Sequence, residues 1–213
     1  MLQAVIFALV VAQAAPVVRN TWAAQYQKGS AESFATQFEE PSREIYRYRA
    51  AIVQLMQLKP GMTAAEVGAG SGFLARFMVT KVGANGRVIA NELEPKMVAH
   101  MKAIATKEGL TNFTVVQGQP RATGFEPASI DAVAVVQSFS FFDHPVDMLK
   151  SLNESLKPNG LLLIVDSPRE GAPPAAPGMD AEEVIPMAEA AGFTRVGENG
   201  IVPGHYALIF RKK

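Results

Sequence analysis

The sequence predicts an α/β fold of the doubly wound type, in which helices cover both faces of a seven-stranded, mostly parallel sheet. Short apolar segments that suit buried strands alternate along the chain with amphipathic segments at helical spacing. The last two strands are joined by residues 197–204 alone, which is too short for a helical crossover, so we expect the last strand to run antiparallel. The 213 residues suffice for one α/β domain with a sizeable core.

The individual elements follow from periodicity and from the positions of glycine and proline. Apolar residues recur at helical spacing over 43–58, where Pro60 and Gly61 end the helix, and residues 131–136 are as apolar as a buried parallel strand. Strands are expected at 63–67, 87–91, 113–116, 131–136, 161–165, 193–196 and 205–211. Helices are expected at 43–58, from Phe73, from Pro95, and at 145–156 and 181–191.

The N-terminus has a composition of its own. Residues 1–15 carry no charged side chain, residues 5–12 are apolar, and Ala12-Gln13-Ala14 fits a small-x-small cleavage site. These features predict a signal peptide and export to a periplasmic or outside compartment; the alternative is a retained apolar helix on a cytoplasmic protein. We therefore divide the chain into residues 1–15, an N-terminal helical or lid segment at 16–58, and a cofactor-binding domain at 59–213.

Composition excludes several classes of partner and site. Twenty basic and twenty acidic residues balance, and no polybasic run suggests nucleic acid. The chain has no cysteine, hence neither a disulfide nor a thiolate metal site, and no metal is expected. The apolar N-terminal segment is too short for a stable membrane span. A small-molecule substrate is the expected partner, and the oligomeric state is left open.

A glycine-rich segment is the main functional motif. Residues 65–73 read Ala-Glu-Val-Gly-Ala-Gly-Ser-Gly-Phe between a strand and a helix, and Glu92 follows the next strand. Glycine lets the backbone approach a ligand closely, a helix start presents free N–H groups, and an acid about twenty residues on suits ribose hydroxyls. This pattern predicts an adenosine-containing cofactor.

The sequence of this turn fits the patterns of two cofactor classes. The segment starting at Gly70 fits the dinucleotide pattern G-x-G-x-x-A. The same turn also resembles the E/D-x-G-x-G-x-G loop of class I S-adenosylmethionine-dependent methyltransferases, which Glu66, Gly68, Gly70 and Gly72 match in full. A pyrophosphate disfavours a nearby anion, whereas a donor with an ammonium and a sulfonium tolerates one, so Glu66 favours S-adenosylmethionine.

The resemblance to this family extends over residues 43–166, and it implies a Rossmann-like fold. Residues 86–97, 115–119 and 155–166 are similar to its later blocks, in order. The resemblance implies that Glu92 binds the ribose hydroxyls. Gln119 stands where the family often has an Asp that contacts the adenine amino group, and its amide oxygen can accept the same hydrogen bond. Leu93 and Gln137 complete the expected cofactor contacts.

The acceptor side is expected beyond the ends of the later strands, because ligands bind at the carboxyl ends of parallel strands. Phe139, Phe141 and Phe142 follow the fourth strand and are candidates for an apolar wall, although a core role is the alternative for two of the three. The candidate bases are His144 and His205. The resemblance implies that the helix before the first strand forms a lid over the cofactor. Arg43 and Tyr46 lie in this helix and are candidates for lining the substrate pocket.

The expected function is S-adenosylmethionine-dependent methyl transfer to a small, partly apolar acceptor by in-line displacement. The donor is already activated, so the protein supplies orientation, proximity and a dry pocket. The alternatives are a protein methyltransferase, an S-adenosylmethionine-binding protein without activity, and a nicotinamide-dependent oxidoreductase.

Overall fold

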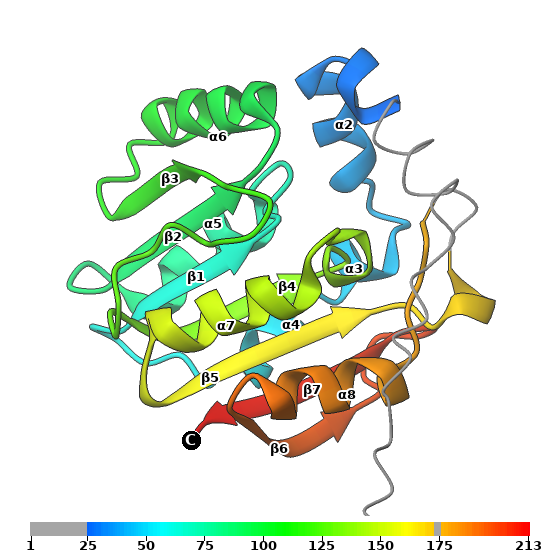
Figure 1. Cartoon of the computed structure of the whole chain (residues 1–213). Coiled ribbons are helices and arrows are strands. Elements are labelled where there is room, and N and C mark those ends of the chain that lie inside the picture. Colours follow the sequence, from blue (N-terminus) through cyan, green and yellow to red (C-terminus); the bar gives the residue numbers. More distant parts are fainter. Residues whose placement is uncertain (1–24, 173–175) are drawn as a thin grey trace, which may run out of the picture.

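The computed structural model describes residues 25–172 and 176–213, so the expected signal segment at 1–15 lies outside the described residues. A seven-stranded sheet crosses the molecule in the order β3-β2-β1-β4-β5-β7-β6 (Figure 1). The strands are β1 (Thr63–Val67), β2 (Arg87–Glu92), β3 (Phe113–Gln117), β4 (Ile130–Val136), β5 (Leu156–Asp166), β6 (Phe193–Asn199) and β7 (Tyr206–Lys212). The doubly wound α/β fold is thereby confirmed.

Helices pack on both faces of this sheet. The helices are α2 (Ala31–Phe38), α3 (Glu44–Arg47), α4 (Arg49–Leu55), α5 (Phe73–Val82), α6 (Pro95–Lys107), α7 (Pro145–Ser155) and α8 (Ala181–Ala190), with short 3-10 turns η1 (Phe139–Phe141) and η2 (Arg169–Gly171). Apolar residues of α4, α5 and α6 share one core cluster with the sheet, and those of α7 and α8 share a second. Successive strand residues such as Ala64 and Ala65 enter opposite clusters, as alternation in a two-faced sheet requires.

The direction of the last strands decides where the final loop lies. Strand β7 pairs antiparallel with both β5 and β6, whereas β1 to β5 pair parallel, as expected. The loop between β6 and β7 therefore lies at the same edge of the sheet as the carboxyl ends of the parallel strands. Because His205 directly precedes β7, this topology brings it to the ligand edge.

Two elements differ most from expectation, while other boundaries shift by one to three residues. The helix expected over 43–58 is divided into α3 and α4, because Tyr48 leaves helical geometry with φ −93° and ψ 11°. Strand β5 begins at Leu156 rather than near residue 161, with a register shift against β4 after Ile130. The early start follows from pairing of Ile130 with Leu156, a contact that periodicity within one segment does not reveal.

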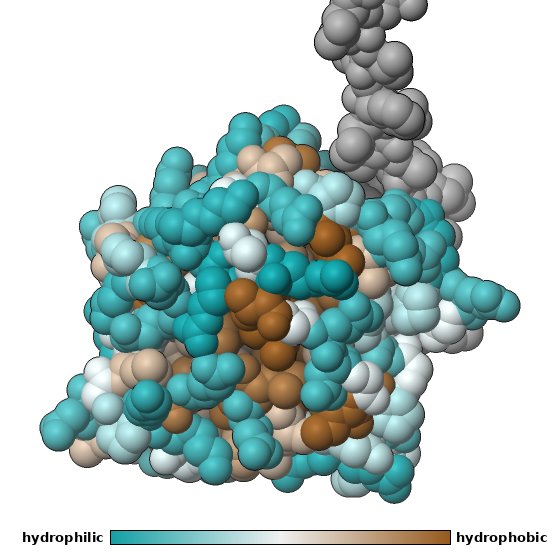
Figure 2. All heavy atoms as spheres, turned by 90° about the horizontal axis from the view of Figure 1, so that it is seen from below, coloured by the Kyte–Doolittle hydropathy of each residue, from teal (hydrophilic) through white to brown (hydrophobic). Residues whose placement is uncertain are grey.

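Strand β6 forms one of the two edges of the sheet, and β3 forms the other. From below in Figure 1, where β6 and α8 lie, apolar atoms gather in the middle of the surface within a polar frame (Figure 2). Val196 of β6 is 56% exposed, and charged Arg195 and Glu198 stand beside it on the same strand. Charged side chains on an edge strand oppose pairing with another sheet.

Within the described residues, no helix has the length and apolar character to cross a membrane.

Candidate cofactor and acceptor site

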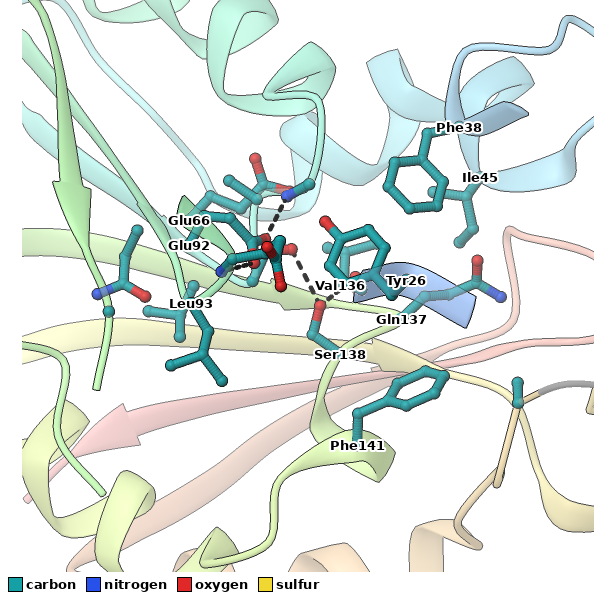
Figure 3. Close-up of a pocket in the computed structure, with 18 of the residues that line it drawn as sticks. Tyr26, Phe38, Ile45, Glu66, Glu92, Leu93, Val136, Gln137, Ser138 and Phe141 are labelled. Atoms are coloured by element: carbon teal, nitrogen blue, oxygen red, sulfur yellow. Dashed lines mark hydrogen bonds between the residues drawn. The ribbon is translucent and has the colours of Figure 1, made fainter. Parts of the chain in front are cut away.

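A cavity of about 1060 Å³ lies beyond the carboxyl ends of β1, β2 and β4 and beneath the N-terminal segment. Figure 3 shows Glu66 and Glu92 on its strand side, with Tyr26, Phe38 and Ile45 of the N-terminal segment facing them. Leu93 and Phe141 line other parts of the wall. The ligand edge predicted from topology is thus the site of a real cavity.

The glycine turn gives the cavity a wall of bare backbone. Gly68 and Gly70 adopt φ values of 76° and 55°, which L side chains rarely take. A β-carbon at Gly68 would lie 2.4 Å from the Ser138 hydroxyl oxygen, which donates a hydrogen bond of 3.0 Å to the Gly68 carbonyl. The turn therefore requires glycine for two reasons, backbone conformation and close approach of the loop after β4.

The third glycine of the turn has a packing role. Gly72 has φ 76° and caps the start of α5, where a β-carbon would lie 2.7 Å from the Met101 sulfur. Gly72 does not line the cavity, in contrast to Gly68 and Gly70. Its place against α6 fits close packing of a helix on its neighbour better than contact with a ligand.

Glu92 is held in place by backbone groups at the end of β2. It is 5% exposed, and its two carboxylate oxygens accept hydrogen bonds from the N–H groups of Gly70 at 2.8 Å and Glu94 at 2.9 Å. Each carboxylate oxygen retains a further acceptor position. The carboxylate therefore suits a pair of neighbouring hydroxyl donors, as on a ribose, and it ties the glycine turn to the start of α6.

Glu66 is the second buried acid of the cavity. It is 3% exposed at the end of β1 and accepts a hydrogen bond of 2.9 Å from the Ala75 N–H in the first turn of α5. Burial raises the pKa of Glu66 to about 8, the Ala75 hydrogen bond opposes this rise, and the charge of Glu92 adds to it. A positive group in the cavity favours the ionised form of Glu66.

The charge of the cavity wall selects among cofactors. Among the described lining residues, seven are acidic and one is an arginine. The acidic residues are Glu40, Glu44, Glu66, Glu92, Glu94, Asp143 and Asp166. A pyrophosphate would meet repulsion in such a cavity, whereas S-adenosylmethionine carries a sulfonium and an ammonium against one carboxylate. The charges, the glycine wall and the Glu92 carboxylate all fit S-adenosylmethionine.

The remaining cofactor candidates lie on the expected side of the cavity. Leu93 is 55% exposed and Gln119 is exposed, and both line the cavity beyond β2 and β3. An apolar side chain open to a cavity suits stacking against an adenine ring. Gln117 is engaged elsewhere, because its amide nitrogen donates to the backbone carbonyls of Leu93 and Glu92.

The N-terminal segment covers the cavity and is anchored at two points. Lys96 of α6 donates hydrogen bonds to the backbone carbonyls of Tyr26 and Gly29, and its ammonium lies 5.3 Å from the Phe34 ring centre. Arg76 of α5 forms ion pairs with Glu39 at 2.7 Å and Glu108 at 2.9 Å. These contacts hold α2 beside α6, as Figure 1 shows.

Two aromatic residues of the covering segment, Tyr26 and Phe38, line the cavity. Burial raises the pKa of the Tyr26 phenol, and the charges of Glu92 and Glu94 raise it further, so the ring lies beside these carboxylates. A β-carbon at Gly70 would lie 3.0 Å from the Phe38 ring. Tyr26 and Phe38 were not predicted as site residues, because aromatic residues that recur in an otherwise polar segment are their only signal in the sequence.

Two expected acceptor-side residues, Arg43 and His205, line the cavity and are connected to each other through Gln137. The Arg43 guanidinium donates to the Gln137 side-chain oxygen at 2.7 Å, and the Gln137 amide nitrogen lies 2.8 Å from Nε2 of His205. Arg43 also donates to the Phe38 carbonyl at 2.7 Å. Gln137, expected beside the cofactor, thus also contacts both acceptor-side candidates.

The other acceptor-side candidates divide between cavity and core. Phe141 and Phe142 line the cavity, with Met148 beside them. Phe139 is fully buried against the second core cluster and lies outside the lining, so the core alternative describes this residue. Tyr46 packs on Phe73 at 5.3 Å between ring centres rather than lining the cavity. His144 occupies the N-cap position of α7, also outside the lining.

Asp166 is a buried acid on the acceptor side, at the end of β5. Its carboxylate accepts hydrogen bonds from the N–H groups of Ser140 at 3.0 Å and Ser167 at 2.8 Å, and from the Ser140 hydroxyl at 3.3 Å. Burial raises the pKa of Asp166 to about 6, against the lowering effect of these donors. Its hydrogen bonds to Ser140 hold η1 and thereby position the loop that carries Phe141.

The fold and the cavity together resemble a class I S-adenosylmethionine-dependent methyltransferase domain, and the cavity fits S-adenosylmethionine. Within the chain, residues 64–160 match the family model described as a methyltransferase domain. This range includes the glycine turn, Glu92 and the loop after β4. The resemblance noted from the motifs is confirmed.

Similar proteins share the fold and differ in named activity. Protein-L-isoaspartate O-methyltransferase of Methanococcoides burtonii is 31% identical over 115 residues, 54% of each chain. Ubiquinone/menaquinone biosynthesis C-methyltransferase UbiE of Legionella pneumophila is 27% identical over 60% of this chain and 50% of that protein. A crystal structure of a SAM-dependent methyltransferase from Aquifex aeolicus has a TM-score of 0.78 at 24% identity, covering 87% of this chain and all of that one. The match spans about half the length of the two curated relatives.

Proposed function

We propose that this protein transfers the methyl group of S-adenosylmethionine to a small, partly apolar acceptor by in-line displacement. The observation that carries this proposal is the continuity of the cavity, which extends from Glu66 and Glu92 to Phe141 and His205. One compartment can therefore hold the donor and an acceptor together, and orientation in a dry pocket is the main contribution that methyl transfer needs from a protein.

The walls of the acceptor side support a small apolar acceptor. Phe141, Phe142, Met148, Val136 and Ile45 line the cavity there. The N-terminal segment covers this space, which favours a free small molecule over a side chain on a folded protein. Among the similar proteins, one is named as a quinone-biosynthesis C-methyltransferase and one as a protein O-methyltransferase, so the protein acceptor is the second candidate.

His205 is the candidate general base for acceptors that must lose a proton. It lines the cavity, and burial lowers its pKa, so the neutral ring is favoured near pH 7. In the structure its Nε2 atom already faces the Gln137 amide at 2.8 Å. Acceptor binding would have to displace that amide before His205 takes a proton, and acceptors that need no base avoid this step.

Turnover with defined acceptors tests the proposal. We would incubate the protein with S-adenosylmethionine and, separately, with quinol-like phenols, small amines and an isoaspartyl peptide, and measure release of S-adenosylhomocysteine. The proposal predicts release with at least one small acceptor and none with the peptide. Release with the peptide alone would show that the acceptor is a protein, and binding without release in any arm would favour a non-catalytic binding protein.

A further inference from the structure

Three side chains from distant parts of the chain meet on the acceptor side of the cavity. Arg43 precedes α3, Gln137 follows β4, and His205 precedes β7. The distances are 2.7 Å from Arg43 Nη2 to Gln137 Oε1, and 2.8 Å from Gln137 Nε2 to His205 Nε2. The Nδ1 atom of His205 lies 2.8 Å from the Pro203 carbonyl oxygen. We call Arg43, Gln137 and His205 the amide bridge.

Arg43 at one end and the Pro203 carbonyl at the other determine which atoms of the amide bridge carry protons. Arginine can only donate, so the Gln137 oxygen faces Arg43 and its NH2 group faces His205. The Pro203 carbonyl can only accept, so Nδ1 of His205 carries the proton. Nε2 must then accept the hydrogen bond from Gln137. The amide bridge is complete only with a neutral His205 in the Nδ1–H form.

Gln137 has little freedom to rearrange. Its backbone lies in the left-handed region with φ 47°, which is uncommon for a residue other than glycine. Its backbone N–H donates to the Val165 carbonyl at 2.7 Å, which fixes the end of β4 on β5. An uncommon conformation that the surroundings maintain is a recurrent property of functional loops.

Protonation of His205 is incompatible with these contacts. A protonated ring would present an N–H at Nε2 to the NH2 group of Gln137. Turning the amide by 180° would satisfy His205 but would place the NH2 group against the Arg43 donors. Arg43 and His205 lie at opposite ends of the amide, and its single oxygen can face only one of the two cations, so the contact with Arg43 or that with His205 must break.

The groups around His205 shift its pKa in both directions. Burial is the main cause that lowers the pKa of His205, and the charge of Arg43 lowers it further. The Pro203 carbonyl and the charge of Glu44 in α3 oppose this. Asp166 at the end of β5 lines the same cavity. The outcome of these opposing effects is a lowered pKa, which agrees with the neutral ring that the hydrogen bonds require.

We propose that Gln137 is a positioning residue that joins the N-terminal segment to the terminal hairpin through Arg43 and His205, and that it closes the acceptor side only while His205 is neutral. This inference rests on the proposed function. Protonation of His205 at low pH breaks this contact on the acceptor side. Loss of the contact lowers ligand affinity and increases the motion of residues 43–47.

Gln137→Glu provides the sharpest test, because a carboxylate accepts from Arg43 and from protonated His205 at once. The chain has three histidines, so the His205 Cε1–H resonance is identified by its loss in His205→Asn. In the unmodified protein we expect His205 to titrate below 6.5. In Gln137→Glu we expect its pKa to rise by at least ~1 unit, a tenfold change in proton affinity. Gln54→Glu adds the same charge at an exposed position of α4 and should leave the titration unchanged.

Ligand binding and hydrogen exchange provide a second readout. In Gln137→Ala at pH 7.5, amides of residues 43–47 should exchange faster than in the unmodified protein, while the melting temperature controls for folding. Affinity for S-adenosylhomocysteine should fall between pH 7.5 and 5.5 in the unmodified protein and fall less in Gln137→Glu.

Equal His205 pKa values in the unmodified protein and in Gln137→Glu, or unchanged exchange in Gln137→Ala, would overturn the proposal. The titration needs no ligand, so its result is separable from failure of the methyltransferase assignment. That assignment would fail instead if S-adenosylhomocysteine did not bind at any pH.

Discussion

At the scale of single residues, two buried acids give the cavity its character. Glu66 and Glu92 lie side by side in Figure 3, and burial raises the pKa of each. Their backbone donors differ, because Glu92 accepts from Gly70 and Glu94 whereas Glu66 accepts from Ala75. Glu92 is oriented for hydroxyl groups, and burial makes ionisation of Glu66 unfavourable until a cationic ligand stabilises its charge.

Glu66→Gln should separate protein stability from cofactor affinity. The folded state raises the pKa of Glu66 from 4.5 to about 8, so it binds more protons than the unfolded state within that window. The free energy of unfolding therefore falls as pH rises from 4.5 to 8. Removing the charge should stabilise the unliganded protein at pH 8 by roughly 1 kcal/mol or more, and should weaken binding of S-adenosylmethionine.

Chemical denaturation at pH 5 and pH 8, with titration of the ligand, would measure both effects. Glu126→Gln makes the same change at an exposed position and should alter neither quantity. Equal stability of Glu66→Gln and the unmodified protein at pH 8 would show that Glu66 does not carry this electrostatic cost.

More of the predicted cofactor residues than of the predicted acceptor residues line the cavity. Glu66, Gly68, Gly70 and Glu92 were found because the ligand-facing backbone and acids sit in one short pattern. Phe139 and Phe141 are two residues apart, and only the 3-10 turn that Asp166 holds sends one into the core and the other to the cavity. Which phenylalanine enters the core therefore depends on a hydrogen bond between Ser140 and Asp166, which lie 26 positions apart in the sequence. A local sequence pattern does not contain this information.

At the scale of elements, α2 matters because it covers the cavity while contacting the domain through few residues. Its N-cap Ser30 accepts from the Ser33 N–H at 3.1 Å, which starts the helix. Tyr26, Phe34 and Phe38 then pack around Met97 of α6. A covering element held by one small apolar cluster and a few polar contacts is expected to open at lower cost than the sheet.

Lys96→Met should loosen this cover. The substitution removes the donors to the Tyr26 and Gly29 carbonyls and the charge near the Phe34 ring, while it keeps an apolar stem. We expect faster amide exchange in Ala31–Phe38 and a loss of S-adenosylhomocysteine affinity of about tenfold, on the order of 1 kcal/mol. Mass spectrometry and calorimetry measure the two effects.

Lys102→Met is the matched control, since Lys102 is exposed on the same helix. If both variants changed exchange in α2 equally, charge on α6 rather than the specific contacts of Lys96 would hold the cover.

Element boundaries were predictable where they depend on local chemistry. Strand β1 matches its expected residues 63–67, because glycine and proline delimit it on both sides. The break at Tyr48 was not predictable, because the apolar positions on either side keep helical spacing across it.

At the scale of the whole molecule, strand order explains how distant motifs form one site. The order β3-β2-β1-β4-β5-β7-β6 places the ends of β1, β2 and β4 next to one another, and reversal of β7 returns His205 to that edge. The shared edge and the reversal of β7 were predictable, since the carboxyl ends of parallel strands meet at one edge and a short loop forces reversal. The order of the strands was not predicted and comes from the structure. The resemblance implied a lid in the N-terminal segment, but the packing of this segment against α6 is seen only in the structure.

Binding of S-adenosylhomocysteine, measured as a shift in melting temperature, would show directly whether the cavity takes the cofactor of a methyltransferase. A ligand at a hundred times its Kd adds about 2.7 kcal/mol to the free energy of unfolding, which should raise the melting temperature by roughly 5–10 °C for a chain of this size. NAD should give no shift, and Glu92→Gln should reduce the shift with S-adenosylhomocysteine. A shift with NAD, or none with S-adenosylhomocysteine and S-adenosylmethionine, would contradict the account.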